Sequence, residues 1–158
     1  MYMAQMHFEK FDECYYAAFD VSGKSYCPPT ETTHTSDTPG HGLTRNVELA
    51  DIAGFYRAFG VELNEQVERV DCIAAELEFL QLVAAKQAIA CEALGQDNAE
   101  AAEQVEICRN AAQAFLKDHL TRWLGKFVLA LERTGAAEVY VTAARLARDF
   151  AQFDTQAA

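Results

Sequence analysis

Apolar side chains recur at steps of three and four residues over most of the chain, which is the spacing of an amphipathic α-helix. The first pattern places Phe8, Phe11, Tyr15 and Phe19 on one face. All three prolines lie in one segment, and runs of β-branched residues are nearly absent, so helix propensity is high elsewhere. The sequence therefore predicts an all-α fold.

The same spacing resumes after the proline-containing segment and predicts five further helices, making about six in total. They are expected at about 47–59, 71–94, 97–118, 120–134 and 137–153. Asn46 and Asp71 are placed to cap the helices at 47–59 and 71–94, because a short polar side chain accepts hydrogen bonds from the first turn of a helix. Gly60, Gly95 and Gly135 mark helix ends, where glycine is favoured.

Two of these helices carry long apolar stripes that we expect to face the core of a compact helical bundle. The stripe of the longest helix is made of Ile73, Leu77, Leu80, Ala84, Ala88 and Cys91. The stripe of the last helix is made of Tyr140, Ala143, Leu146, Ala147, Phe150 and Phe153.

No periodicity is visible at residues 21–45, which contain the prolines and a mixture of threonine, serine and histidine. A loop of this length inside a compact domain is usually functional or mobile. The chain is accordingly predicted to be one domain, 1–158. It comprises a first helix at 1–20, the Pro/Thr-rich loop at 21–45 and a helical body at 46–158.

The composition limits the classes of function. The chain has 158 residues and a formal charge of −11, and an acidic protein does not bind nucleic acid by neutralising phosphates. Its apolar runs are too short to span a bilayer, and its first residues do not resemble a secretory signal, so we expect a cytoplasmic protein without membrane insertion. Its five cysteines are an odd number, and they are expected to be reduced thiols.

Groups that catalyse reactions or bind metals are sparse. Cys27, His34 and His41 are the candidate zinc ligands, but their spacing matches no common zinc module. A thiol- or metal-dependent enzyme built on these residues and Cys72 stays a minor alternative. No metal, cofactor or catalytic residue is predicted.

Two further polar groups have structural interpretations. Glu76 and Glu78 point about 200° apart on one helix and cannot act as a carboxylate pair. His119 lies at a helix junction, where we interpret it as a capping or hydrogen-bonding residue.

A peptide-binding groove is the remaining possibility. The Pro/Thr-rich loop, Phe55, Tyr56 and the acidic start of the longest helix can together form an apolar floor with a negative rim. Such a groove suits a basic, apolar peptide. The alternative is that Phe55, Tyr56 and Phe59 are core residues.

Four segments resemble one protein family. Residues 48–60 (ELADIAGFYRAFG) are similar to the helix that follows the variable loop in the TorD/DmsD/NarJ family of molybdoenzyme maturation chaperones. Residues 68–80 (ERVDCIAAELEFL) resemble its Glu-x-Pro-Asp-His motif and the following Glu-Leu-x-Phe-Leu helix. Residues 27–32 (CPPTET) resemble its Pro-Pro-Tyr-Glu-Ser/Thr loop, and residues 115–123 (FLKDHLTRW) resemble its Phe-Leu-x-x-His-Leu-x-x-Trp segment.

The resemblance implies a cytoplasmic helical chaperone without catalytic activity. Family members bind the twin-arginine signal peptide, and sometimes the body, of a molybdopterin-dependent oxidoreductase and assist cofactor insertion before export. The family's leader-binding motifs correspond here to Asp71 with Cys72 and to Pro28, Pro29 and Glu31. Cys72 replaces the family's histidine, and a valine replaces its proline.

An arginine of the leader would pair best with carboxylates, because its fork of donors matches two oxygens. Glu31, Asp71 and Glu76 are the expected partners. Asp71 can act both as a helix cap and as an arginine ligand.

The resemblance also bears on assembly. Members of the family usually have further helices before the Pro-rich loop, whereas one is predicted here, so we expect a homodimer, with exchange of helices as one way to form it. A permanently bound accessory subunit of an oxidoreductase is the alternative function.

Overall fold

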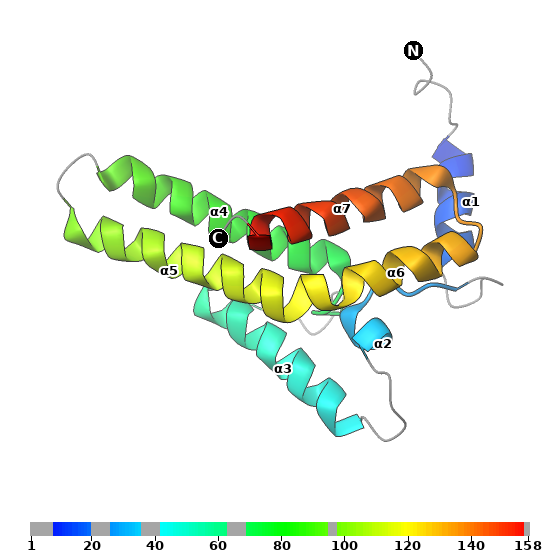
Figure 1. Ribbon diagram of the computed structural model, residues 1–158, viewed down its shortest axis with the longest axis horizontal. Helices are drawn as coiled ribbons and strands as arrows, with labels where there is room; N and C mark the ends of the chain where they lie inside the picture. The colour runs from blue at the N-terminus through cyan, green and yellow to red at the C-terminus, as the bar shows by residue number, and fades with distance from the viewer. Residues whose placement is uncertain (1–7, 20–25, 36–41, 63–68, 95–97, 157–158) are drawn as a thin grey trace, which may run out of the picture.

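The computed structural model describes residues 8–19, 26–35, 42–62, 69–94 and 98–156 (Figure 1). Helices make up most of this part of the chain. They are α1 (Phe8–Phe19), α2 (Glu31–Thr35), α3 (Gly42–Ala58), α4 (Ile73–Ala93), α5 (Ala99–Phe115), a π-helix (Leu116–Leu120), α6 (Thr121–Arg133) and α7 (Glu138–Gln156). The described ranges contain no strand, only a bridge between Thr30 and Cys72. The all-α prediction is confirmed.

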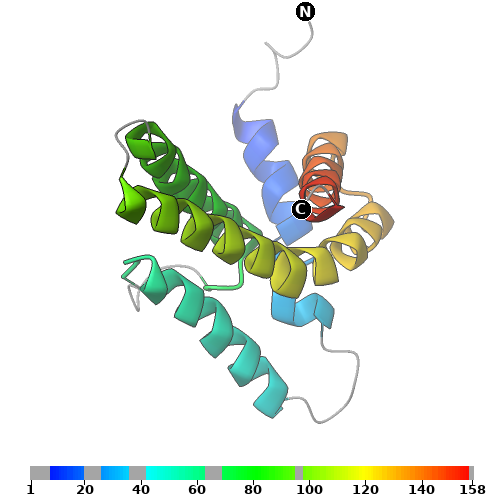
Figure 2. The same ribbon diagram turned by 60° about the vertical axis from the view of Figure 1, so that its left-hand side comes forward.

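Four of the long helices pack as two pairs, α4 with α5 and α6 with α7, and α3 lies beside them. α4 and α5 lie antiparallel as a hairpin, and α7 folds back along α6 (Figures 1 and 2). α5, the π-helix and α6 follow one another without a break, and α3 lies along the other side of this junction. α1 packs against the start of α7, where Tyr15 and Phe19 contact the ring of Tyr140.

Aromatic side chains fill the core where α3, α4 and α5 meet. Phe79 and Phe115 have ring centroids 4.7 Å apart, and Tyr56 lies 5.1 Å from Phe79. Phe55 contacts Phe115 edge-on at 5.2 Å. Tyr56 is therefore a core residue, and Phe55 packs against the core although it is only half-buried. This arrangement agrees with the alternative that these rings are core residues.

Several predicted helix limits are wrong. The expected loop contains the short helix α2, and α3 already begins at Gly42, so Asn46 lies inside a helix and does not cap one. Asn98 does cap α5, since its side chain accepts hydrogen bonds from Glu100 N and Ala101 N. Gly95 lies outside the described residues.

The buried faces of two helices also differ from the prediction. α4 buries Glu76, Phe79, Leu80, Val83 and Ala90. Of the stripe predicted there, only Leu80 is buried, because α4 is apolar on most of its circumference and its spacing does not select one face. α7 buries Val141, Ala144 and Ala151 and exposes Leu146, Phe150 and Phe153.

Two glycines provide a matched test of the backbone. Gly135, after α6, has a φ of +72°, whereas Gly125 lies inside α6, and a Cβ at either position would meet no atom within 4 Å. Gly135→Ala is expected to lower the free energy of unfolding by about 1 kcal/mol, because this conformation is strained for alanine. Gly125→Ala should raise it by about 0.5 to 1 kcal/mol, since alanine is the better helix former.

Urea unfolding of both variants measures these differences. A loss of stability in Gly125→Ala, or none in Gly135→Ala, would contradict the backbone geometry described above.

A further finding concerns membranes. Among the helices in the described ranges, none is long and apolar enough to cross a bilayer.

Candidate functional site

Buried polar side chains gather where α2, the start of α4 and the π-helix meet. Glu31, Asp71 and Glu76 have no exposed surface, and Thr32 and His119 expose 2% or less. They come from segments up to 88 positions apart in the sequence. Because buried polar groups need partners, this cluster fixes the arrangement of three segments.

The Pro/Thr-rich segment is bound to the start of α4 through its backbone. Glu31 N donates to Asp71 O, and Ile73 N donates to Pro29 O, both at 2.9 Å. Between them lies the bridge from Thr30 to Cys72. The two segments that resemble the leader-binding motifs of the family are thus paired with each other.

Asp71 caps a helix, but not the one predicted. The N-cap residue of α4 is Cys72, whose side chain makes no capping hydrogen bond. The Oδ2 atom of Asp71 instead accepts from Thr32 N at 3.1 Å and Thr32 Oγ1 at 2.7 Å, in the first turn of α2. Arg69 donates to both carboxylate oxygens, at 2.9 and 2.8 Å. Burial alone would raise the pKa of Asp71, but the hydrogen bonds from Arg69 and Thr32 hold it below its ordinary value.

The pKa of Glu76 is shifted in the opposite direction to that of Asp71. Its Oε2 atom accepts from Trp123 Nε1 at 3.1 Å inside the protein. Burial, reinforced by the nearby charge of Glu31, raises the pKa of Glu76 to about 9. Glu76 is therefore protonated and neutral at pH 7.

His119 joins this interior to the surface. Its Nδ1 atom lies 3.0 Å from Glu31 Oε2, and its Nε2 atom lies 3.4 Å from Asp51 Oδ2 on α3. The rings of Phe55 and Phe115 flank the imidazole at 5.7 and 4.8 Å. Glu31 thus fixes the ring so that Nε2 faces α3, where it has no hydrogen bond of good geometry. The π-helix places the histidine here, and such segments are frequent at functional sites.

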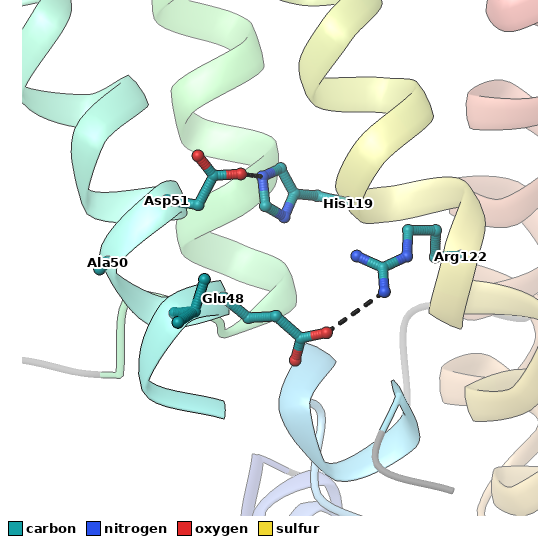
Figure 3. Close-up of a pocket in the computed structure, with 6 residues that line it drawn as sticks. Glu48, Ala50, Asp51, His119 and Arg122 are labelled. Atoms are coloured by element: carbon teal, nitrogen blue, oxygen red, sulfur yellow. Dashed lines mark hydrogen bonds and ion pairs between the residues drawn. The ribbon is translucent and has the colours of Figure 1, made fainter. Parts of the chain in front are cut away.

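A pocket of about 660 Å³ opens beside His119 (Figure 3). It is lined by Val47, Glu48, Ala50 and Asp51 of α3, by His119 and by Arg122 of α6. The side chain of Asp51 is 62% exposed, and that of Arg122 is 47% exposed. Arg122 Nη2 lies 3.2 Å from Glu48 Oε1, and Arg122 Nη1 lies 3.9 Å from Glu31 Oε1.

The lining of this pocket includes none of the predicted site residues. Phe55 contacts His119, and Glu31 binds it from the interior, whereas Tyr56 donates to the carbonyl of Val70 at 2.8 Å. The carboxylates of Glu31, Asp71 and Glu76 are completely buried, so in this conformation they form no open rim. Pro28, Pro29 and Cys72 are half-buried.

Sequence reasoning missed the lining of the pocket itself. Glu48 and Asp51 are three residues apart on α3, and His119 and Arg122 are three apart near the start of α6, so each pair shares a helix face. This spacing of charged and histidine side chains is the sequence signal that could have indicated the pocket.

Two of the candidate zinc ligands, Cys27 and His34, have structural roles. Cys27 is buried, and burial raises its pKa to about 11, which disfavours the thiolate that binds metals. His34 stacks on Trp123 at 5.7 Å and pairs with the carbonyl of Pro28. His41 lies outside the described residues. Within the described ranges, no group of three or more His, Cys, Asp or Glu residues could hold a metal ion.

Comparison with known proteins points to one family. Residues 2–129 match the family described as Nitrate reductase delta subunit. The chain is also similar to the perchlorate reductase assembly chaperone protein of Dechloromonas aromatica (strain RCB), with 29% identity over 153 residues. That alignment covers 90% of this chain and 59% of the relative, so the chain spans less than two thirds of the relative's length. No solved structure gives a significant match.

Proposed function

The chain belongs to the nitrate reductase delta subunit family of NarJ/TorD-type chaperones, and we therefore propose that it is an assembly chaperone of a molybdopterin-dependent oxidoreductase. The match over residues 2–129 carries this proposal, and the assembly role in the name of the perchlorate reductase relative supports it. In this role the protein binds the catalytic subunit in the cytoplasm, assists insertion of its cofactor and releases it for export. It catalyses no reaction itself.

We further propose that the pocket between α3 and α6 binds the twin-arginine signal peptide of the client. Asp51 and Glu48 supply carboxylates for a guanidinium group, and the exposed side chain of Val47 adjoins them as apolar surface. The volume of about 660 Å³ lies in the range of ordinary ligand pockets. The net charge of −11 steers a basic peptide toward the protein.

The residues first predicted to bind the leader then act from behind the pocket. Glu31 holds the imidazole of His119 against Asp51, and Asp71 holds the helix that carries Glu31. Pro28, Pro29, Phe55, Tyr56, Cys72 and Glu76 complete this framework in the proposal.

Binding of the leader gives the first functional test. The double variant Glu48→Gln/Asp51→Asn should weaken binding of a twin-arginine leader peptide at least about tenfold, because two charge-assisted hydrogen bonds are lost. Isothermal titration calorimetry measures the affinity. Replacing the arginines of the peptide with lysines should weaken it as well, since lysine cannot form a bidentate pair.

The double variant Glu78→Gln/Glu103→Gln is the control. It removes the same charge from exposed positions of α4 and α5 that do not line the pocket. Equal affinities in the two double variants would exclude the pocket as the leader site. A wild-type protein that binds no leader would contradict leader binding altogether.

We also propose that the protein forms a homodimer, as the sequence predicts, either by surface contact or by exchange of helices. The permanently bound accessory subunit is the less favoured alternative, because the relative is named for assembly. Co-purification at fixed stoichiometry with the mature oxidoreductase would favour that alternative.

A further inference from the structure

Large apolar side chains are exposed along one face of α7. Val139, Leu146, Phe150 and Phe153 expose 42%, 70%, 50% and 74% of their surface. Single exposed apolar residues are common, but four on one helix form a continuous surface of the kind that marks an interaction site. Together with the exposed Ala143, these residues are called the α7 seam below.

The α7 seam has the spacing of a helix–helix contact. Its five members follow one another at steps of four, three, four and three residues: Val139, Ala143, Leu146, Phe150 and Phe153. This is the a/d repeat through which two helices interlock side chains. The partner that fits this seam is therefore another helix with the same repeat.

The seam cannot turn inward to join the core. The opposite face of α7 is already buried through Val141, Ala144 and Ala151. Arg145 lies on the side of α7 between the two faces, and its Nη2 atom lies 2.8 Å from Glu132 Oε1 on α6. The exposed face of α7 is thus the outer face of a helix fixed in place.

We propose that the α7 seam binds the α7 seam of a second copy of this chain, with the two helices antiparallel and Leu146 facing its own copy at the two-fold axis. In this register Val139 lies level with Phe153, and Ala143 lies within one residue of the level of Phe150. Each large ring meets a smaller side chain, which is the complementarity that close packing requires. The inference deepens the proposed homodimer and is independent of the client.

Charge and area agree with this occupant. Residues 138–153 carry two acidic groups, Glu138 and Asp149, and two basic groups, Arg145 and Arg148, so the seam is locally neutral although the chain is acidic. Two aromatic rings, a leucine and a valine from each copy amount to an interface on the order of 1,000 Å². That area is the lower limit for a specific contact and indicates a weak, reversible dimer.

Analytical ultracentrifugation of the full chain over a wide concentration range tests the proposal. The wild-type mass should rise from one chain to two. Leu146→Lys should weaken the association at least about tenfold, since it places two like charges at the symmetry axis. Leu129→Lys is the matched control, because Leu129 is also an exposed helical leucine, at 55%, but belongs to α6. Circular dichroism verifies that both variants fold.

Cross-linking with a short bismaleimide tests the register, with the wild-type protein as the measure of background from native thiols. Leu146→Cys should form cross-linked dimers, whereas Val139→Cys should not, because in the antiparallel pair the two 139 positions lie about 20 Å apart along the axis. Cross-linking of both variants would indicate a parallel pair and overturn the register. If the wild type is a dimer and Leu146→Lys leaves it intact, the α7 seam is not the interface, but the proposed homodimer stands. A wild-type monomer overturns both and leaves leader binding as a separate result.

Discussion

Glu76→Gln is expected to raise the free energy of unfolding at neutral and alkaline pH, because the folded protein must keep Glu76 protonated. Burial raises the pKa of Glu76 from 4.5 to about 9. Between these values the folded state holds a proton that the unfolded state releases, so wild-type stability falls as pH rises through this window. The slope is about 1.4 kcal/mol per pH unit, and the fall ends above the folded pKa.

Glutamine should remove this pH dependence while keeping the contacts of the protonated acid. Its oxygen can accept from Trp123 Nε1, and its amide is neutral like the protonated carboxyl group. Urea unfolding between about pH 5 and 9 should show a declining wild-type curve and a flatter curve for the variant. The variant should be more stable by a few kcal/mol at the alkaline end.

Glu76→Leu separates titration from hydrogen bonding. Leucine also removes the ionisable group, but it leaves Trp123 Nε1 buried without its acceptor, at a cost of about 1 to 3 kcal/mol at every pH. Parallel pH curves for the wild type and Glu76→Gln would show that the folded protein does not hold this proton.

The helices could be predicted from the sequence because helix formation depends on nearby residues. Their buried faces could not always be predicted, and α7 shows the reason. One face carries large side chains such as Leu146 and Phe150, and the other carries Ala144 and Ala151. The small side chains allow α7 to approach α6 closely, so the face with less apolar surface is the buried one. Periodicity measures apolar surface and contains no information about this fit.

The surroundings of the predicted site residues could not be predicted for a similar reason. The Pro/Thr-rich segment and the start of α4 were both identified, but their pairing joins residues about 40 positions apart in sequence, such as Thr30 and Cys72. That pairing buries Glu31 and Asp71, which were expected to pair with an arginine of the leader. The five-residue helix α2 has no periodicity of its own, and its cap comes from Asp71. Only tertiary structure could reveal these features.

Asp71→Asn is expected to lower the free energy of unfolding by about 3 kcal/mol, because it breaks a buried pair and uncaps α2. The carboxylate accepts from Thr32 N, from Thr32 Oγ1 and twice from Arg69. Asparagine keeps one acceptor oxygen, and its amide group faces the guanidinium of Arg69 with donors against donors.

The pH dependence of this loss should be opposite in sign to that of Glu76. The pKa of Asp71 lies below its ordinary value of 3.8, so its stabilisation is complete above that value and is lost as pH falls through the folded pKa. The stabilities of the wild type and Asp71→Asn should therefore converge in acid. Asp118→Asn, an exposed change on the π-helix, is the control and should have little effect at any pH.

The same pair of variants tests whether α2 positions the pocket. Asp71 holds α2, α2 carries Glu31, and Glu31 orients His119 toward Asp51. Asp71→Asn should therefore weaken leader binding even under conditions where the variant is fully folded, whereas Asp118→Asn should not. A folded Asp71→Asn variant with wild-type affinity would restrict Asp71 to a role in stability, because the path from Asp71 through Glu31 to the pocket would then carry no binding energy.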